Sequence, residues 1–260
     1  MAAEKILPKY AGPAINLSSE KMTQAEIRAR FNEEVAIAYS QRKPVWLPDY
    51  DRSLTLVTKM LEPTFAGKKS VRVLDLGAGT GNLSRRILQA FKNSHVTLVD
   101  FSQNMLNEAP IVLAAFLGRY EIKQEDFWEM ELLADSYDAV ISSFALHHGR
   151  GEAVYQRLYK NIFRWLKTPG AFICCDVVDG DTAELAALNM AGWRRYLSGK
   201  ISPTDIERMF SNYKREDSPI SLRTHMSCLS EAGFTKADVL WKRFNFAVYT
   251  GIKEPSLFLH

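Results

Sequence analysis

Short apolar runs alternate with helical stretches over residues 71–178, and this alternation constrains the fold more than any other feature of the sequence. The runs are rich in β-branched and aromatic residues, and they read VRVLDL, HVTLVD, YEIKQED, YDAVISS and GAFICCDVV. Strands that are separated by helices are typical of a parallel sheet covered on both faces. The sequence therefore predicts an α/β fold with about five parallel strands.

The alternation stops after the fifth run and then resumes. Residues 181–218 predict two helices, with Ser202-Pro203 as the cap and first turn of the second. A further helix follows, and Gly233 is placed to end it. The last two runs, KADVLWKR and FNFAVYTGI, have only Phe244 and Asn245 near the turn between them, so we expect them to pair as an antiparallel hairpin. The expected sheet then has seven strands, mostly parallel.

A separate amphipathic helix is expected ahead of the sheet. Its apolar positions repeat at helical spacing and are Ile27, Phe31, Val35 and Tyr39. The chain then divides into four predicted parts: an N-terminal helical cap over 1–65, a core over 66–180, a helical insertion over 181–218, and the completion of the core over 219–260.

Composition excludes several classes of protein. The chain has 260 residues, 47% of them hydrophobic, which is enough for one sizeable core. A net charge of +3 is too small to indicate a nucleic-acid surface by itself. The three cysteines, Cys174, Cys175 and Cys228, fit neither a disulfide framework nor a tetrahedral zinc site. With no signal-peptide pattern and no run approaching the ~18 apolar residues of a membrane span, we expect a cytoplasmic protein.

A glycine-rich turn, in the stretch VLDLGAGTGNLS, joins the first strand to the first helix of the core. Gly77, Gly79 and Gly81 form a G-x-G-x-G pattern, whereas a dinucleotide fingerprint needs its third glycine where Asn82 stands. Asp75, just before the turn, would repel a pyrophosphate but can accept a hydrogen bond from a cationic amino group. Both features argue against a nicotinamide cofactor, although the glycines can also be explained as ordinary turn residues.

Two further acids follow the next strands. Asp100 ends the second strand and suits the two hydroxyls of a ribose, or else caps the following helix. Asp126 can accept from an exocyclic amine, and Phe127 beside it can flank a flat base. A loop Asp before an aromatic residue is also common without a ligand. An amino group, a ribose and an adenine without a phosphate describe S-adenosylmethionine.

The order VLDLGAGTG, LVDFSQNML, QEDF, YDAVISSFALHH, LKTPGAFICCD and a terminal hairpin resembles a class I S-adenosylmethionine-dependent methyltransferase. This resemblance covers residues 25–253 and implies a Rossmann-like sheet. It also implies a set of cofactor-binding residues, which are Asp75, Gly77, Ala78, Gly79, Asp100, Phe101, Met105, Asp126, Phe127, Ser143 and Phe144. Met105 can equally be an ordinary packing residue.

The two ends of the chain resemble a subgroup of small-molecule methyltransferases that includes the carboxy-S-adenosylmethionine synthases. In that subgroup the N-terminal helix and the helices inserted after the fifth strand close over the cofactor. The similarity implies that Tyr39, Arg42, Trp193, Arg194, Tyr196 and Phe244 face the pocket. A simpler explanation for WRRYL is a solvated helix face with two aromatic side chains packed beneath it.

Three residues are candidates for handling a proton: His147, Asp176 and Tyr39. His147 and His148 follow the fourth strand at the edge where α/β proteins bind ligands, and an imidazole there can act as a general base. Asp176 ends the fifth strand and can orient or deprotonate a nucleophile, or simply cap the chain. Alternatively, the pair contributes to a metal site, or His147 is a loop histidine that holds backbone. Adjacent histidines in an extended segment point to opposite faces, which argues against the metal alternative, so no metal ligands are assigned.

The expected reaction is in-line methyl transfer to a small molecule, with a homodimer possible. A nucleic-acid substrate is not expected, because SSFA stands where base-amino DNA methyltransferases have a Pro-Pro-aromatic tetrapeptide. One alternative is an enzyme that uses S-adenosylmethionine itself as substrate, by carboxy-S-adenosylmethionine synthesis or by cyclisation that releases methylthioadenosine. The loop LGAGTG departs from the LGCSLG-like form of the synthases, however. A non-catalytic cofactor-binding subunit is a second alternative, and a nicotinamide oxidoreductase is the least favoured hypothesis.

Overall fold

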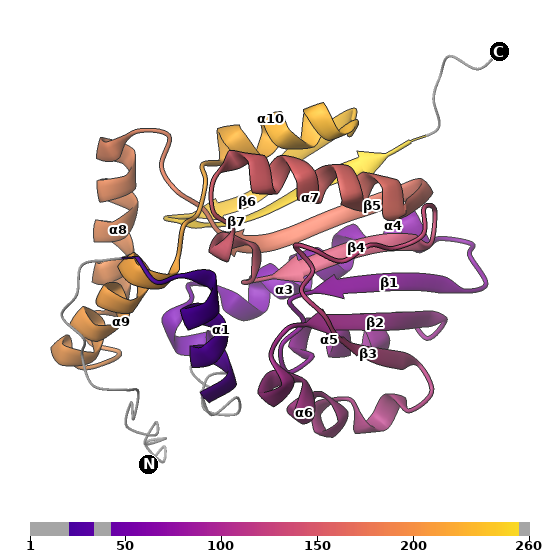
Figure 1. Ribbon diagram of the computed structural model, residues 1–260, viewed down its shortest axis with the longest axis horizontal. Helices are drawn as coiled ribbons and strands as arrows, with labels where there is room; N and C mark the ends of the chain where they lie inside the picture. The colour runs from indigo at the N-terminus through magenta and orange to yellow at the C-terminus, as the bar shows by residue number, and fades with distance from the viewer. Residues whose placement is uncertain (1–20, 34–42, 255–260) are drawn as a thin grey trace.

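The computed structural model describes residues 21–33 and 43–254, and they form a seven-stranded sheet with helices on both faces (Figure 1). The strand order is β3-β2-β1-β4-β5-β7-β6. The strands are β1 (Val71–Leu76), β2 (Ser94–Asp100), β3 (Tyr120–Gln124), β4 (Tyr137–Ser143), β5 (Leu166–Val177), β6 (Lys236–Arg243) and β7 (Phe246–Lys253). The first five are mutually parallel, and β7 pairs antiparallel with both β5 and β6. The predicted fold class and the terminal hairpin are confirmed.

The helices were also largely predicted by their apolar periodicity. They are α1 (Gln24–Glu33), α3 (Tyr50–Met60), α4 (Glu62–Phe65), α5 (Asn82–Ala90), α6 (Gln103–Val112), α7 (Glu152–Trp165), α8 (Ala183–Leu197), α9 (Pro203–Glu216) and α10 (Leu222–Ala232), with short 3-10 turns η1 (Ala114–Phe116) and η2 (Leu146–His148). Ser202 caps α9 and Gly233 ends α10 in a left-handed conformation, as expected. Val35 and Tyr39 of the predicted first helix lie outside the described residues.

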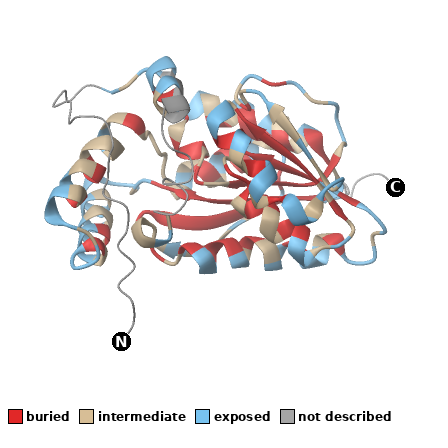
Figure 2. Ribbon diagram, turned by 90° about the horizontal axis from the view of Figure 1, so that it is seen from below, coloured by how far each residue is buried: buried red, intermediate tan, exposed pale blue. Residues whose placement is uncertain are grey.

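Two hydrophobic clusters, one on each face, hold the helices to the sheet. Tyr50, Leu54 and Val57 of α3 belong to the first cluster together with side chains of α5, α8 and α9. The second cluster joins α7 and α10 to the opposite face. Figure 2 shows the buried residues concentrated in the sheet and on the inner sides of the helices. Although α3 falls within the predicted N-terminal cap, it is a core helix, because its apolar side packs directly on the sheet.

The strand order reverses between β1 and β4, which makes this the switch point of the sheet. The chain runs from β1 to β2 and β3 on one side, and β4 and β5 lie on the other. Ligands of open α/β sheets bind in the crevice at the carboxyl ends of the strands beside such a point. The helices α1, α8 and α9 gather at that same edge (Figure 1). The fold therefore directs attention to the loops that follow β1 and β4.

Candidate functional site

The glycine loop after β1 exposes backbone at the switch point. Gly77, Gly79 and Gly81 have φ values of 66°, 55° and 81°, in the left-handed region that favours glycine. A Cβ on Gly77 would lie 2.2 Å from the Cβ of Ala145, so this position also demands close approach to the segment after β4. A Cβ added to Gly79 would have open space around it: apart from its chain neighbours, no heavy atom of the described residues lies within 4 Å of that position. The backbone of this loop can therefore contact a ligand directly.

Asp75, at the end of β1, is a buried carboxyl group with one oxygen available. Its side chain is fully buried, and Oδ2 accepts a hydrogen bond of 2.6 Å from the Ser84 hydroxyl. The other oxygen, Oδ1, has no hydrogen-bond partner in the part of the chain that the structure describes. Burial raises the pKa of Asp75 to about 7, although the Ser84 hydrogen bond opposes this effect. A cationic amino group would satisfy both the orphaned oxygen and the buried negative charge.

Asp100 connects the end of β2 to the glycine loop. Its Oδ2 accepts from the backbone N–H of Gly79 at 2.8 Å, and its Oδ1 accepts from that of Ser102 at 2.9 Å. The hydroxyl of Ser102, rather than Asp100, caps α6 by accepting from the N–H of Met105. Asp100 thus holds the glycine loop through the hydrogen bond from Gly79. Burial raises the pKa of its carboxyl group above the ordinary value. Met105 is buried, and Phe101 is partly buried.

Asp126 and Phe127 follow β3 on the same edge of the sheet. Phe127 is buried, and its ring lies 3.4 Å from the position of a Cβ on Gly77, so it borders the glycine loop. Asp126 is partly buried and accepts from the backbone N–H of Trp128 at 3.1 Å. The tertiary structure therefore brings the carboxyl groups predicted after β1, β2 and β3 to one edge.

The segment from Ser143 to His148 lies between the glycine loop and a neighbouring pocket. Ser143 and Ala145 are partly buried, and Ala145 is the residue that meets Gly77. Phe144 has a φ of 55°, which is strained for a residue with a side chain, and its ring lines the pocket. The left-handed conformation of Phe144 turns the chain from β4 into the 3-10 turn that carries both histidines.

Asp176 and His147 form a buried pair, of which His147 lines the pocket. The Asp176 carboxylate accepts the N–H groups of Leu146 and His147 at 2.7 and 3.1 Å, and it contacts Nδ1 of His147 at 2.5 Å. Because a carboxylate accepts, Nδ1 carries the proton, and Nε2 of the neutral ring is an acceptor. Burial would lower the pKa of His147, but the charges of Asp176 and Asp217 outweigh it and raise the pKa.

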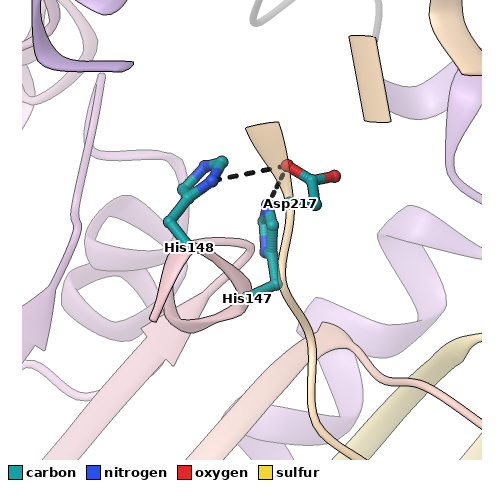
Figure 3. Close-up of side chains that lie close together, drawn as sticks. All are labelled: His147, His148 and Asp217. Carbon is teal, nitrogen blue, oxygen red and sulfur yellow. Dashed lines mark ion pairs between the residues drawn. The ribbon is translucent and has the colours of Figure 1, made fainter. Parts of the chain in front are cut away.

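The two histidines do not point to opposite faces, so the prediction that they diverge is wrong. They lie in the 3-10 turn η2 instead of an extended segment, and their ring centroids are 4.1 Å apart. Both rings face Asp217, as Figure 3 shows. Nε2 of His147 lies 3.7 Å from Oδ1 of Asp217, and Nδ1 of His148 lies 3.4 Å from the same oxygen. Burial raises the pKa of Asp217 to about 6.

The pocket, called the cap pocket below, lies under the helices at the carboxyl edge of the sheet. It is lined by Arg30, Trp46, Leu47, Phe144, His147, His148, Val177, Trp193, Met209, Asn212, Tyr213, Glu216 and Asp217. The indole N–H of Trp193 donates to the carbonyl of Trp46 at 2.8 Å, and Arg30 is paired with Glu216. These contacts join the N-terminal part of the chain to the α8–α9 insertion above the pocket.

The predicted cap residues have different surroundings. Of these residues, Trp193 lines the cap pocket, whereas Arg194 is paired with Glu207 on the exposed side of α8. Tyr196 is partly buried, with Arg243 over its ring at 5.4 Å. The partly buried Phe244 packs against α8 in the structure, which also explains why residue 192 is a glycine: a Cβ there would lie 2.4 Å from the Phe244 ring. Tyr39 and Arg42 lie outside the described residues.

Sequence reasoning missed two charged residues at this site. Asp217 directly follows α9, about 70 residues along the chain from His147, and no local pattern marks it. Lys43 begins a helical turn at residues 43–46. Burial has the largest effect on the pKa values of Asp75, Asp100 and His147, and the positive charge of Lys43 lowers all three. Only proximity in space identifies either residue.

The sequence matches a known domain family and is similar to several enzymes. Residues 73–170 match the family model of a methyltransferase domain. The carboxy-S-adenosyl-L-methionine synthase of Nautilia profundicola is 22% identical over 229 residues, which cover 88% of this chain and 96% of that protein. The malonyl-[acyl-carrier protein] O-methyltransferase of Bacillus cereus is 28% identical over 135 residues, 48% of this chain and 46% of that protein.

Solved structures confirm the fold. The phosphoethanolamine N-methyltransferase 2 of Haemonchus contortus, in complex with S-adenosyl-L-methionine, superposes with a TM-score of 0.64 at 15% identity. That superposition covers 88% of this chain and 60% of the other chain. The chain therefore carries a methyltransferase domain of the S-adenosylmethionine-dependent kind, built on a Rossmann-like sheet.

Proposed function

We propose that this protein transfers the methyl group of S-adenosylmethionine to a small-molecule acceptor bound in the cap pocket. One observation carries the proposal: the segment after β4 contacts the glycine loop through Ala145 and lines the cap pocket through Phe144 and His147. A cofactor on the loop and an acceptor in the pocket would be neighbours across this short segment. Catalysis of methyl transfer depends mainly on such alignment and on the exclusion of water.

The residues at the carboxyl edge fit the cofactor. The buried, orphaned Oδ1 of Asp75 suits its amino group, and the Asp100 carboxylate suits the ribose hydroxyls. Asp126 and Phe127 are assigned to the adenine. The remaining assigned contacts are Gly77, Ala78, Gly79, Phe101, Met105, Ser143 and Phe144. When bound, S-adenosylmethionine supplies a strongly electrophilic methyl group on sulfur.

His147 is the proposed group that takes the acceptor's proton. Methyl transfer would form a bond from the acceptor atom to the methyl carbon and break the sulfur–methyl bond, so S-adenosylhomocysteine would leave and the acceptor's proton would pass to Nε2 of His147. Asp176 is a positioning residue, because its carboxylate is occupied by backbone N–H groups and by Nδ1 of His147. Tyr39 and Arg42 remain proposed participants from the N-terminal cap. Trp193, Tyr196 and Phe244 are the residues of the insertion and hairpin that are proposed to face the acceptor. Arg194 is proposed to do so only after it leaves its exposed ion pair with Glu207.

The acceptor is proposed to be a small molecule, and neither nucleic acid nor membrane is proposed as a partner. Arg30 is the only lysine or arginine among the described lining of the cap pocket, so this lining offers no channel of basic residues for a polynucleotide. No helix within residues 21–33 and 43–254 has the length and apolar character to cross a membrane. All three cysteines are free and buried, which supports our proposal of a reducing, cytoplasmic location. A homodimer is proposed as the form in solution.

A second candidate function is that S-adenosylmethionine is itself the substrate. Similarity to a carboxy-S-adenosyl-L-methionine synthase over 88% of the chain favours this candidate. It includes carboxy-S-adenosylmethionine synthesis and cyclisation with release of methylthioadenosine.

Mass spectrometry of adenosyl products distinguishes the two candidates. The purified protein is incubated with S-adenosylmethionine alone and then with an added metabolite extract. Formation of S-adenosylhomocysteine only with the extract is the result expected for methyl transfer, and fractionation then identifies the acceptor. Methylthioadenosine from the first incubation, or a heavier adenosyl product from either one, would overturn methyl transfer in favour of the second candidate. The Asp176→Asn variant should lose turnover while retaining affinity for S-adenosylhomocysteine, and the exposed Asp51→Asn change is its control.

A further inference from the structure

Two imidazoles and one carboxylate converge in the lining of the cap pocket. His147, His148 and Asp217 each offer one ligand atom, and these three atoms all lie within 4.8 Å of one another (Figure 3). Two histidines and one carboxylate are a ligand set used by zinc enzymes and by non-haem iron enzymes. None of the fold, the methyltransferase assignment or the proposed reaction requires this convergence.

The separations between the ligand atoms suit an ion better than direct hydrogen bonds. Oδ1 of Asp217 lies 3.4 Å from Nδ1 of His148 and 3.7 Å from Nε2 of His147. A charge-assisted hydrogen bond would be about 2.7–2.9 Å. Two ligands that each lie about 2.0–2.1 Å from a tetrahedral ion are about 3.4 Å apart. Both separations from Asp217 are thus close to the value for a shared ion, and the two imidazole nitrogens lie within 4.8 Å of each other.

Backbone contacts hold the ligands in this arrangement. The 3-10 turn η2 puts consecutive histidines on one side, where an extended chain would separate them. The N–H of Ser218 donates to the carbonyl of His147 at 2.8 Å, which fixes the residue next to Asp217 against the turn. Residues that are distant in sequence are therefore held together independently of any ligand.

Asp176 supplies the outer support that histidine ligands commonly have. Its carboxylate lies 2.5 Å from Nδ1 of His147, which fixes the ring and directs the lone pair of Nε2 toward Asp217. A carboxylate–histidine–metal relay of this kind orients the ligand and raises its basicity. Glu216 adds another carboxylate to the lining, although Arg30 is paired with it and the charge of Lys43 also reaches the histidines.

We infer that His147, His148 and Asp217 bind a divalent transition-metal ion, of which Zn²⁺ is the first candidate. The inference rests on the geometry of these side chains and goes beyond the proposed methyl transfer. Open coordination positions would face the cap pocket. Since one lone pair on Nε2 serves either a proton or a metal, the metal-loaded protein and the protein with His147 as base are alternative states.

Competition with a chromophoric chelator tests the site without requiring turnover. The metal-free full-length protein is titrated with Zn²⁺, and we expect one tightly bound ion per chain. His148→Gln and Asp217→Asn should each weaken binding by at least about tenfold, and Asp176→Asn by about 10–100-fold through loss of outer support. Matched controls are His95→Gln, at the start of β2, and Asp135→Asn, beside Lys253 on the surface. Both controls should bind Zn²⁺ like the unchanged protein.

Cobalt provides a second measurement that needs no variant. Co²⁺ in a site of low coordination number should give visible absorption bands that Zn²⁺ abolishes on addition. Failure of the unchanged protein to take up Zn²⁺, or equal binding by the folded His148→Gln and Asp217→Asn variants, would overturn the site. Since neither readout involves S-adenosylmethionine, failure here is distinct from failure of the proposed methyl transfer.

Discussion

Replacement of Asp75 by asparagine should change stability and cofactor affinity in opposite directions at alkaline pH. Burial raises the pKa of Asp75 from 3.8 to about 7, so the folded protein keeps a proton that the unfolded chain has already released. Ionisation of this buried group therefore destabilises the fold. The resulting loss of stability develops as the pH rises from about 4 to about 7 and is constant above that range.

The size of the effect follows from the pKa shift. A shift of about 3 units corresponds to about 4 kcal/mol at about 1.4 kcal/mol per unit, and about 3 kcal/mol of this falls between pH 5 and pH 8. An asparagine at position 75 carries no charge, although its amide N–H groups would cost about 1–3 kcal/mol if they stayed unpaired. That cost does not depend on pH. The free energy of unfolding of Asp75→Asn, relative to the unchanged protein, should thus rise by about 3 kcal/mol from pH 5 to pH 8.

Urea denaturation at pH 5, 6, 7 and 8 measures this difference, and calorimetric titration with S-adenosylhomocysteine measures affinity at pH 8. The variant should bind about 10–100-fold more weakly, because a hydrogen bond to a charged partner is worth about 1.5–3 kcal/mol. Asp51→Asn, on the exposed surface, is the control for both assays. A parallel pH dependence in the two proteins would refute the burial argument, and unchanged affinity would refute the contact with the amino group.

Three other changes test the site. Gly77→Ala should reduce S-adenosylhomocysteine affinity by at least about tenfold in a titration, because the new Cβ would meet Ala145. Gly118→Ala, also at positive φ but with open space around it, should leave affinity unchanged. Equal losses of affinity in the two variants would argue against the close approach of Gly77 to Ala145. Asp176→Asn should lower the turnover number with metabolite extract by about 100-fold or more without changing cofactor affinity, and a matching loss of affinity would assign it a merely structural role. Added Zn²⁺ should slow methyl transfer and a chelator should restore it, because the ion occupies the lone pair of His147; zinc-insensitive turnover by metal-loaded protein would contradict this exclusion.

Local sequence patterns determined most of the architecture. The continuous apolar runs of the parallel strands, which are buried on both faces, and the 3.6-residue period of the helices are local features, so a short window reveals them. The glycine loop and the acids Asp75 and Asp100 were also predictable, because each is adjacent to a strand end and parallel strands end at one edge. The two-residue spacing between the last runs similarly determined the hairpin.

The tertiary structure alone decided the composition of the cap pocket. Asp217 meets His147 and His148 only because α9 returns to the carboxyl edge of the sheet, and such a contact depends on packing between distant segments. The histidines were predicted to diverge because an extended chain was assumed, whereas the turn after Phe144 makes them converge. The sequence therefore determined the scaffold and the cofactor edge through local geometry, and the fold determined which side chains share the pocket because that choice is made by long-range packing.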